Sequence, residues 1–173
     1  MHIEELSEAE YSGQILAILN HAIINSTALF DYAPRTPEAM RSWFADKRAQ
    51  RSPVLGVITD DRELMGFASY GPFRAWPAYK YTKEISIYVH HGHRRKGVAD
   101  VLMDAIKQKA EAQGIHVLIG VIEAQNQASI KLHLKHGFSP VGVLGQVGFK
   151  FNQWLDVAFY QLILPSPASP VDG

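Results

Sequence analysis

The sequence predicts a mixed α/β fold, with a central sheet flanked by helices and the element order βααβββαβαββ. The segment Lys83–Val89, in which apolar residues alternate, and the short apolar run Val54–Ile58 are both typical of strands. Longer segments with apolar residues at helical spacing lie between strands, including Gly97–Gln113, which ends before Gly114. The segment Ile115–Ile122 is apolar on both faces and therefore predicts a strand in the middle of the sheet.

The N-terminal part of the chain is expected to contain one short strand and two helices. Residues His2–Leu6 predict the strand, and the capping-box pattern Ser7-x-x-Glu10 predicts a helix from about residue 8 to 24. Thr36 followed by Pro37 combines an N-cap with proline at the first helical position, which predicts the start of a second helix. Three residues of this second helix are expected in the core or at an interface: Met40, Trp43 and Phe44.

A β-hairpin is predicted to follow the second helix. It consists of Val54–Ile58 and Leu64–Tyr70, with its turn at Asp60-Asp61 and a bulge at Gly66.

The C-terminal part is expected to close the sheet. Asn126 begins a predicted short helix over Ala128–His136, and Gly137 ends it. Two closing strands are predicted over Phe138–Val143 and Val157–Leu164, with an irregular segment, 144–155, between them.

Length and composition favour a single domain over residues 1–164 and a tail over 165–173 that is expected to be disordered. The formal net charge is zero, which argues against nucleic-acid binding, because such domains usually carry a basic excess. The chain has no cysteine, which excludes disulfides and a cysteine nucleophile. No segment has the pattern of a signal peptide or the length of a membrane span, so a cytoplasmic protein is expected.

A basic run between the strand Lys83–Val89 and the following helix is the most informative feature of the chain. The first N–H groups of a helix lack intrahelical partners and the helix dipole is positive there, so this junction favours an anion. Gly97 would allow a phosphate to approach the backbone, and Ala99 keeps the helix start uncrowded. A solvated basic loop is the alternative. The run is His93-Arg94-Arg95-Lys96-Gly97-Val98-Ala99.

The spacing Arg94-x-x-Gly97-x-Ala99 resembles the pyrophosphate-binding signature of the GNAT superfamily of N-acetyltransferases. The element order is similar to theirs, and the segment from Asn126 through Ser129 and His133 to Phe138 resembles their fourth-helix signature. The resemblance implies a GNAT-type, mainly antiparallel sheet and acetyl-CoA as co-substrate. It also implies three sets of acetyl-CoA contacts: the loop Arg94, Arg95, Lys96, Gly97, Val98 and Ala99; the strand Ile87, Tyr88 and Val89; and Asn126.

Three further segments resemble the phosphinothricin and methionine sulfoximine N-acetyltransferase group of that superfamily. They are Ala68–Arg74, Glu84–Val89 and Gln146–Asp156, and the likeness covers about residues 15 to 164. Ala75-Trp76 and Ile85 depart from the pattern of the group. The resemblance implies detoxification of a small amino-acid-like substrate and a homodimer. Three residues could supply its interface, although each could instead be core: Trp43, Phe44 and Phe151.

Glu84 is the expected general base, because an amine must lose its proton before it attacks a thioester. Its alternative is an exposed charge at a strand edge. Arg74 is expected to hold an α-carboxylate and could instead be a solvated loop arginine. Trp76 could be a hydrophobic lid or a plug for the core. The remaining substrate contacts are expected at Ala75, Ile85 and Ser86.

Two residues of the short helix leave two interpretations each. His133 could protonate the departing thiolate, or it could be a packed core histidine. Lys135 could contact a phosphate of CoA, or it could be solvated on its helix.

The run His90-His91-x-His93 suggests a metal site, which we reject at this stage. Adjacent histidines on an extended segment diverge, and no carboxylate or thiolate lies at ligand spacing in the sequence. No metal cofactor is therefore expected.

The sequence thus predicts an acetyl-CoA-dependent N-acetyltransferase of the α-amino group of a small amino acid, such as methionine sulfoximine, methionine sulfone or phosphinothricin. Direct transfer in a ternary complex is expected, because no cysteine nucleophile is present. Two alternatives stay open. One is acetylation of a protein N-terminus or an aminoglycoside, and the other is a non-catalytic acetyl-CoA-binding sensor.

Overall fold

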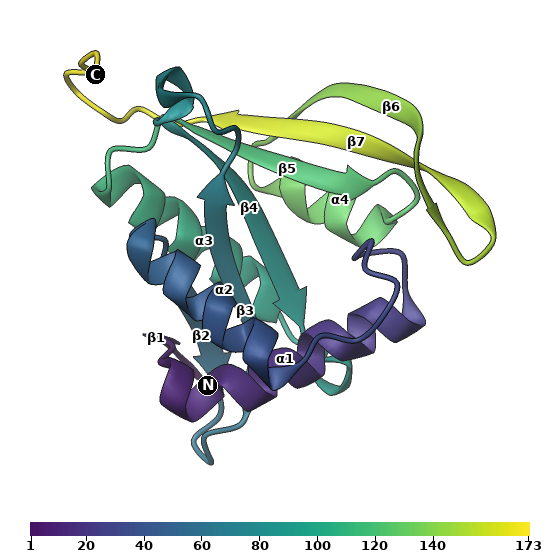
Figure 1. Ribbon diagram of the computed structural model, residues 1–173. Helices are drawn as coiled ribbons and strands as arrows, with labels where there is room; N and C mark the ends of the chain where they lie inside the picture. The colour runs from purple at the N-terminus through teal and green to yellow at the C-terminus, as the bar shows by residue number, and fades with distance from the viewer. The chain divides into compact units, whose positions relative to one another are not determined.

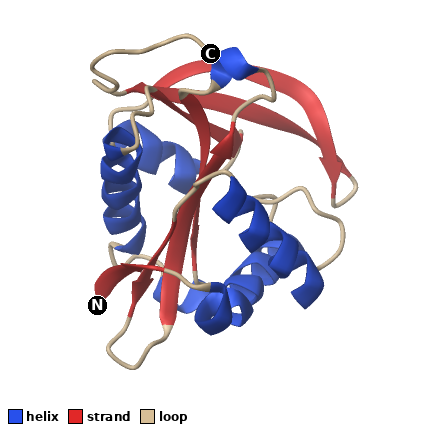
Figure 2. Cartoon of the chain, turned by 60° about the vertical axis from the view of Figure 1, so that its left-hand side comes forward, coloured by secondary structure: helices blue, strands red, loops and turns tan.

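The computed structural model describes all residues of the chain, 1–173, and has the predicted order of strands and helices. Figure 1 labels the elements, and Figure 2 distinguishes strands from helices by colour. The strands are β1 (His2–Glu5), β2 (Val54–Ile58), β3 (Leu64–Pro72), β4 (Thr82–Val89), β5 (Val117–Glu123), β6 (Ser139–Lys150) and β7 (Gln153–Ile163). The helices are α1 (Glu8–Asn25), α2 (Pro37–Ala49), α3 (Val98–Ala112) and α4 (Gln127–Lys135), with short 3₁₀ turns η1 (Pro77–Tyr79) and η2 (His91–His93).

The seven strands form one mixed sheet in the order β1-β2-β3-β4-β5-β7-β6. The pairs β1–β2, β2–β3, β5–β7 and β6–β7 are antiparallel, whereas β4 and β5 are parallel. The predicted mixed, mainly antiparallel sheet is therefore confirmed.

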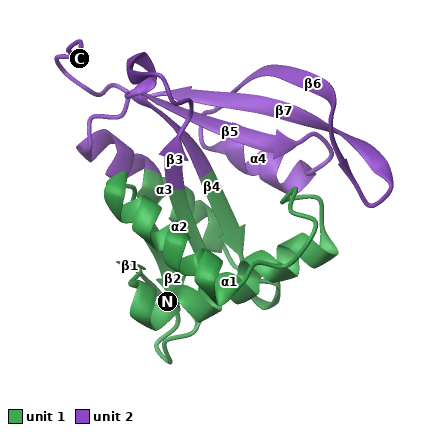
Figure 3. Ribbon diagram, viewed as in Figure 1, with its two compact units in different colours: residues 1–69, 86–106 green, residues 70–85, 107–173 purple.

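The chain divides into two compact units (Figure 3). Unit 1 comprises Met1–Ser69 and Ser86–Ile106, and unit 2 comprises Tyr70–Ile85 and Lys107–Gly173. Three elements, β3, β4 and α3, begin in one unit and end in the other. Neither unit is therefore a continuous piece of the chain.

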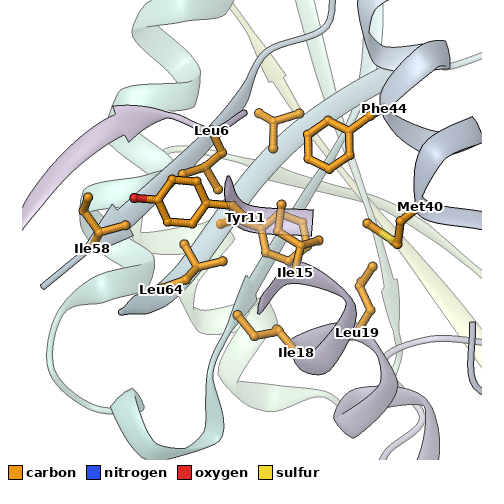
Figure 4. Close-up of a cluster of buried hydrophobic side chains, with 11 residues drawn as sticks. Leu6, Tyr11, Ile15, Ile18, Leu19, Met40, Phe44, Ile58 and Leu64 are labelled. Carbon is orange, nitrogen blue, oxygen red and sulfur yellow. The ribbon is translucent and has the colours of Figure 1, made fainter. Parts of the chain in front are cut away.

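The core of unit 1 lies where α1 and α2 pack on β2 and β3 (Figure 4). The buried face of α1 repeats at three- and four-residue spacing, as an amphipathic helix requires. In α2, Met40 and Phe44 are buried, and the Trp43 ring meets Phe44 and Phe67 edge to face, with ring centroids 4.9 and 6.2 Å apart. Of the two locations predicted for these α2 residues, the core is confirmed. The buried residues of α1 are Tyr11, Ile15, Ile18, Leu19 and Ile23.

The predicted helix caps have different outcomes. The Thr36 side chain accepts a hydrogen bond from the Ala39 N–H at 3.2 Å, so the predicted cap of α2 is confirmed. The capping box at Ser7 is wrong, because this side chain makes no capping hydrogen bond, although α1 begins where it was expected.

The hairpin of β2 and β3 contains the predicted bulge. Val57 pairs with Gly66 but Ile58 pairs with Leu64, so one residue of β3 is extra at this point. A Cβ on Gly66 would lie 2.8 Å from the Tyr88 carbonyl oxygen, which explains why glycine occupies this position.

The predicted irregular segment over 144–155 is wrong. Strand β6 extends to Lys150 and β7 begins at Gln153, so the two strands form one long hairpin (Figure 2). A register shift between Leu144 and Gly148 interrupts the side-chain alternation. The residues at the tip, Phe151 and Asn152, have φ of 50° and 58°, which is typical of a type I′ turn.

The segment after β7 forms no helix or strand but makes several hydrogen bonds. The Ser166 carbonyl oxygen lies 2.7 Å from His116 Nδ1. The Val171 N–H donates to the Tyr81 hydroxyl oxygen at 3.0 Å. The tail therefore contacts two segments of unit 2, the one after η1 and the one before β5.

Candidate active site

The basic run forms the loop that begins α3, in unit 1. Arg94, Arg95 and Lys96 are exposed, and Gly97 has φ +77°, a conformation that favours glycine. A Cβ on Gly97 would meet no atom within 4 Å, so the space beside this backbone is open. Val98 is buried and fixes the helix start in the core.

The backbone at this junction has the arrangement of an anion site. The Val101 N–H donates to the Gly97 carbonyl oxygen at 3.2 Å, so the N–H groups of Gly97, Val98 and Ala99 precede the first intrahelical donor. Helix α3 has 15 residues, which is long enough for a full dipole. The loop can therefore bind a phosphate through N–H groups and through its exposed cations.

The strand before this loop carries the residues predicted to bind pantetheine. Ile87, Tyr88 and Val89 form the end of β4, and the Tyr88 ring packs on Phe67 with centroids 5.5 Å apart. Because the Tyr88 side chain packs on another residue of unit 1, a ligand at this strand would contact mainly the backbone. Such strand addition is a common mode of binding for amide-containing ligands.

Glu84 lies in the first half of β4, in unit 2, and is exposed. It is paired in parallel with Ile119, and the next residue, Ile85, with Gly120. This β4–β5 pairing ends at Ile85–Gly120. Because neighbouring residues of a strand point to opposite faces, Glu84 and Ile119 share one face, and Ile85 and Gly120 share the other.

His133 is buried against the face that contains Gly120. A Cβ on Gly120 would lie 2.7 Å from Cδ2 and Nε2 of the His133 ring. The ring also meets Phe138 and Tyr160, with centroids 4.8 and 6.4 Å apart. Glu84 and His133 therefore belong to opposite faces of the sheet in unit 2.

The hydrogen bond of His133 sets the position of its ring proton. Nδ1 lies 2.8 Å from the Ser129 carbonyl oxygen, which can only accept, so Nδ1 carries the proton and Nε2 is unprotonated in the neutral ring. Burial lowers the pKa of His133, and the bond to Ser129 opposes this effect only in part. The packed interpretation left open for this residue is the one that its surroundings support.

Asn126 and Lys135 lie at the two ends of α4. The Asn126 side-chain oxygen accepts from the Ser129 N–H at 3.2 Å, so this residue caps the helix. Lys135 is exposed in the last turn. Asn126 could therefore contact a ligand only at the N-terminus of α4, and Lys135 only at its C-terminus.

Arg74 and Trp76 lie between the end of β3 and η1. The Arg74 guanidinium carbon is 5.0 Å from the centroid of the Phe73 ring, and that ring meets Tyr79 edge to face at 5.7 Å. Arg74 and Ala75 are exposed, and Trp76 is 75% exposed, so Trp76 is no plug for the core. The residues predicted to bind substrate in this loop thus lie together on the surface of unit 2.

The predicted residues divide between the two units. Unit 1 holds the loop Arg94–Ala99, which we call the anion loop, together with the end of β4 and the half-buried Ser86. Unit 2 holds Arg74, Glu84 and His133. The sequence patterns did not identify the three residues that surround the His133 ring. The available signal was an isolated glycine in an apolar strand, which often marks the close approach of another group. The three residues are Gly120, Phe138 and Tyr160.

None of the helices has both the length and the apolar composition that crossing a membrane requires.

The chain matches the model of the acetyltransferase (GNAT) family over residues 20–138. It is 39% identical to the L-methionine sulfoximine/L-methionine sulfone acetyltransferase of Pseudomonas aeruginosa, over 97% of this chain and 98% of that protein.

Solved structures show the same relationship. A structure from Acinetobacter baylyi, 49% identical, has a TM-score of 0.98, with 99% of this chain and 96% of that chain covered. A phosphinothricin acetyltransferase from Sinorhizobium meliloti in complex with acetyl-CoA is 26% identical and has a TM-score of 0.93, with 99% and 92% covered. The protein is therefore an enzyme that belongs to the GNAT family of acetyltransferases.

Proposed function

We propose that this enzyme transfers the acetyl group of acetyl-CoA to the α-amino group of a small amino-acid-like substrate. Methionine sulfoximine, methionine sulfone and phosphinothricin are the proposed substrates, because relatives that cover most of the chain are named for them. The observation that carries the proposal is the loop at the start of α3, where Gly97 has a positive φ and open space beside it.

The residues present fit acetyl-CoA. Arg94, Arg95 and Lys96 are exposed beside the N-terminus of α3 and would neutralise the pyrophosphate. The end of β4 would pair with the amides of pantetheine. Asn126 stays a proposed cofactor contact on the resemblance of its segment to the family, and Lys135 stays open between a phosphate of CoA and solvent. When bound, acetyl-CoA supplies the acetyl group as a thioester.

Glu84 is proposed as the base for the incoming amine. An ammonium group has no lone pair for attack, so the exposed Glu84 carboxylate would accept one of its protons, directly or through a water. The amine nitrogen then forms a bond to the acetyl carbon and the carbon–sulfur bond breaks, and the second proton that the nitrogen loses neutralises the departing thiolate as CoA thiol. Direct transfer of this kind needs no covalent intermediate on the protein.

Arg74 is proposed to hold the substrate α-carboxylate. Its guanidinium lies on the Phe73 ring, which restricts where the exposed cation can point. Ala75 and the exposed Trp76 would cover the substrate side chain, and Ile85 and Ser86 would offer backbone groups to it. A carboxylate-specific clamp favours free amino acids over aminoglycosides.

His133 has the weaker case for a catalytic role. To protonate the departing thiolate it would have to carry a proton on Nε2, and its lowered pKa makes that form scarce at neutral pH. We propose that the main role of His133 is to pack α4 against β5. A role for His133 as general acid is to be tested only after the role of Glu84 as general base.

We also propose that residues 1–164 act as one domain and that the enzyme is a homodimer. The family match over 20–138 includes parts of both units, which supports a single domain. The β6–β7 hairpin exposes several large apolar residues that a second copy could cover, and Phe151 is 54% exposed at its tip. Light scattering should give twice the chain mass. The detoxifying role and the cytoplasmic location stay predictions.

Release of CoA thiol from acetyl-CoA, measured with a panel of amino compounds, tests the proposed function. We expect release with methionine sulfoximine, methionine sulfone or phosphinothricin, and little with an aminoglycoside or an N-terminal peptide. Release with only the last two compounds would support the alternative substrates. Binding of acetyl-CoA without release for any compound would support a non-catalytic sensor.

A further inference from the structure

The turn η2, just before the anion loop, places its last residue, His93, and its N-cap residue, His90, beside a carboxylate from another part of unit 1. The His93 N–H donates to the His90 carbonyl oxygen at 2.9 Å, which closes the turn. His93 Nε2 lies 3.0 Å from Glu63 Oε1. One possible ligand atom from each of Glu63, His90 and His93 lies within 4.8 Å of the others.

Strand β3 fixes both segments that carry these side chains. The His90 N–H donates to the Met65 carbonyl oxygen at 2.9 Å. Glu63 immediately precedes β3. Its carbonyl oxygen accepts from the Thr59 N–H at 2.9 Å, and its N–H donates to the Thr59 hydroxyl oxygen at 3.1 Å. The backbone of the cluster is therefore held in place without any ligand.

The reason for rejecting a metal site from the sequence does not apply to this geometry. The segment forms a 3₁₀ turn and is not extended, so residues three apart, His90 and His93, lie on one side. The missing carboxylate comes from Glu63, which is distant in sequence.

We propose that Glu63, His90 and His93 bind a divalent transition metal ion such as Zn²⁺. Two imidazoles and one carboxylate are common ligands of Zn²⁺ and Co²⁺. Metal–ligand distances of about 2.1 Å place tetrahedral ligand atoms about 3.4 Å apart. The His93–Glu63 pair at 3.0 Å is close to this value, and the Glu63 side chain, 56% exposed, is free to adjust. Water would complete the coordination.

Lys96 would oppose this binding in a specific way. Its ammonium group lies 3.2 Å from His93 Nδ1 and can only donate, so Nδ1 accepts and Nε2 carries the proton that is shared with Glu63. A metal ion at Nε2 would take the place of that proton. The neutral ring would then carry its proton on Nδ1, which can no longer accept from Lys96.

The site is tested by titrating the full chain with Co²⁺ and Zn²⁺. The chain carries no histidine tag, and the titrations contain no acetyl-CoA. We expect one Co²⁺ per chain, seen by visible absorption, and its displacement by Zn²⁺ in calorimetry. Glu63→Gln, His90→Gln and His93→Gln should each weaken Co²⁺ binding at least about 100-fold, because changes outside the ligand set alone cost about 10- to 100-fold. His91→Gln is the matched control, because His91 offers no ligand atom to the cluster although its ring centroid lies 4.3 Å from that of His90.

The role of Lys96 gives a second measurement. Lys96→Met should bind Co²⁺ more tightly than the unmodified chain, and by more than Arg95→Met, which removes the same charge one residue away. The site is refuted if the unmodified chain binds no Co²⁺, or if binding is equal in Glu63→Gln and His91→Gln. An equal increase in Co²⁺ affinity in Lys96→Met and Arg95→Met would refute the proposal that Lys96 weakens metal binding through its hydrogen bond to His93. None of these outcomes depends on the proposed acetyl transfer.

Discussion

Burial of His133 makes the stability of this protein depend on pH. The side chain belongs to the buried set, at 5% exposure, and its Nδ1 proton is donated to the Ser129 carbonyl oxygen. Burial lowers its pKa below the ordinary value of 6.5 in the folded chain. Between the folded pKa and 6.5, the unfolded chain therefore binds more protons at this residue than the folded chain does.

This difference fixes the sign and the upper limit of the effect. The free energy of unfolding rises with pH where the unfolded state binds more protons, so the stability contributed by neutral His133 is lost as pH falls from 6.5 toward the folded pKa. One proton corresponds to a slope of at most about 1.4 kcal/mol per pH unit. His21 and His90 also have lowered pKa values, caused mainly by burial, and act in the same direction.

Urea denaturation at several pH values between about 5 and 7.5 measures the slope, with His133→Leu as the comparison. The variant will lose stability at every pH, but its slope should be smaller by up to about 1.4 kcal/mol per pH unit. Imidazole NMR signals of the folded chain give the pKa itself. A midpoint for His133 at or above 6.5, or an unchanged slope in the variant, would refute the reasoning.

Three further substitutions test the site. Gly97→Val, at φ +77°, should leave a folded chain that binds acetyl-CoA far more weakly, and unchanged affinity in calorimetry would exclude the phosphate loop. Arg74→Ala should raise KM for the amino acid about 10- to 150-fold and leave KM for acetyl-CoA nearly unchanged, as expected for a lost charged hydrogen bond; equal rates on a free acid and its methyl ester would contradict the clamp. Gly120→Ala places a Cβ 2.7 Å from His133 and should destabilise by about 1–3 kcal/mol, or about 2–12 °C in Tm. In a His133→Ala background the same change should cost less, and an equal loss in both backgrounds would argue against the contact.

Local patterns predicted the helices because caps and glycine stops act within a few residues. Thr36 caps α2 through its side chain, and Gly137, at φ +89°, ends α4 as expected. Ser7 shows the limit of this reasoning, because the same pattern occurs without the hydrogen bond. A cap motif therefore located the start of α1 without predicting its contacts.

The β6–β7 hairpin was harder to predict. Its register shift near Leu144 breaks the period of two, and most of β6 is exposed, so neither alternation nor a buried face marks the strand. Its turn, Phe151-Asn152, lacks the Asn-Gly pair that usually signals such a hairpin.

Contacts between distant parts of the chain account for what the local patterns could not show. The place of Glu63 beside His90 and His93 depends on how β3 is aligned with η2, which no local pattern encodes. The space for His133 likewise depends on Gly120, from a different element. By contrast, the residues proposed for the anion loop lie within one short segment, so local patterns sufficed to place that segment between β4 and α3.

The dependence of kcat/KM on pH, compared between the unmodified enzyme and Glu84→Gln, tests the central claim most directly. The reaction is acetylation of methionine sulfoximine, and acetyl-CoA affinity serves as the control for intact binding. General-base catalysis contributes about 10²- to 10⁴-fold, so Glu84→Gln should lower kcat by that factor and lose the acidic limb of the profile. Retention of the full rate with the same acidic limb would contradict the account, since the amine would then lose its proton to another group.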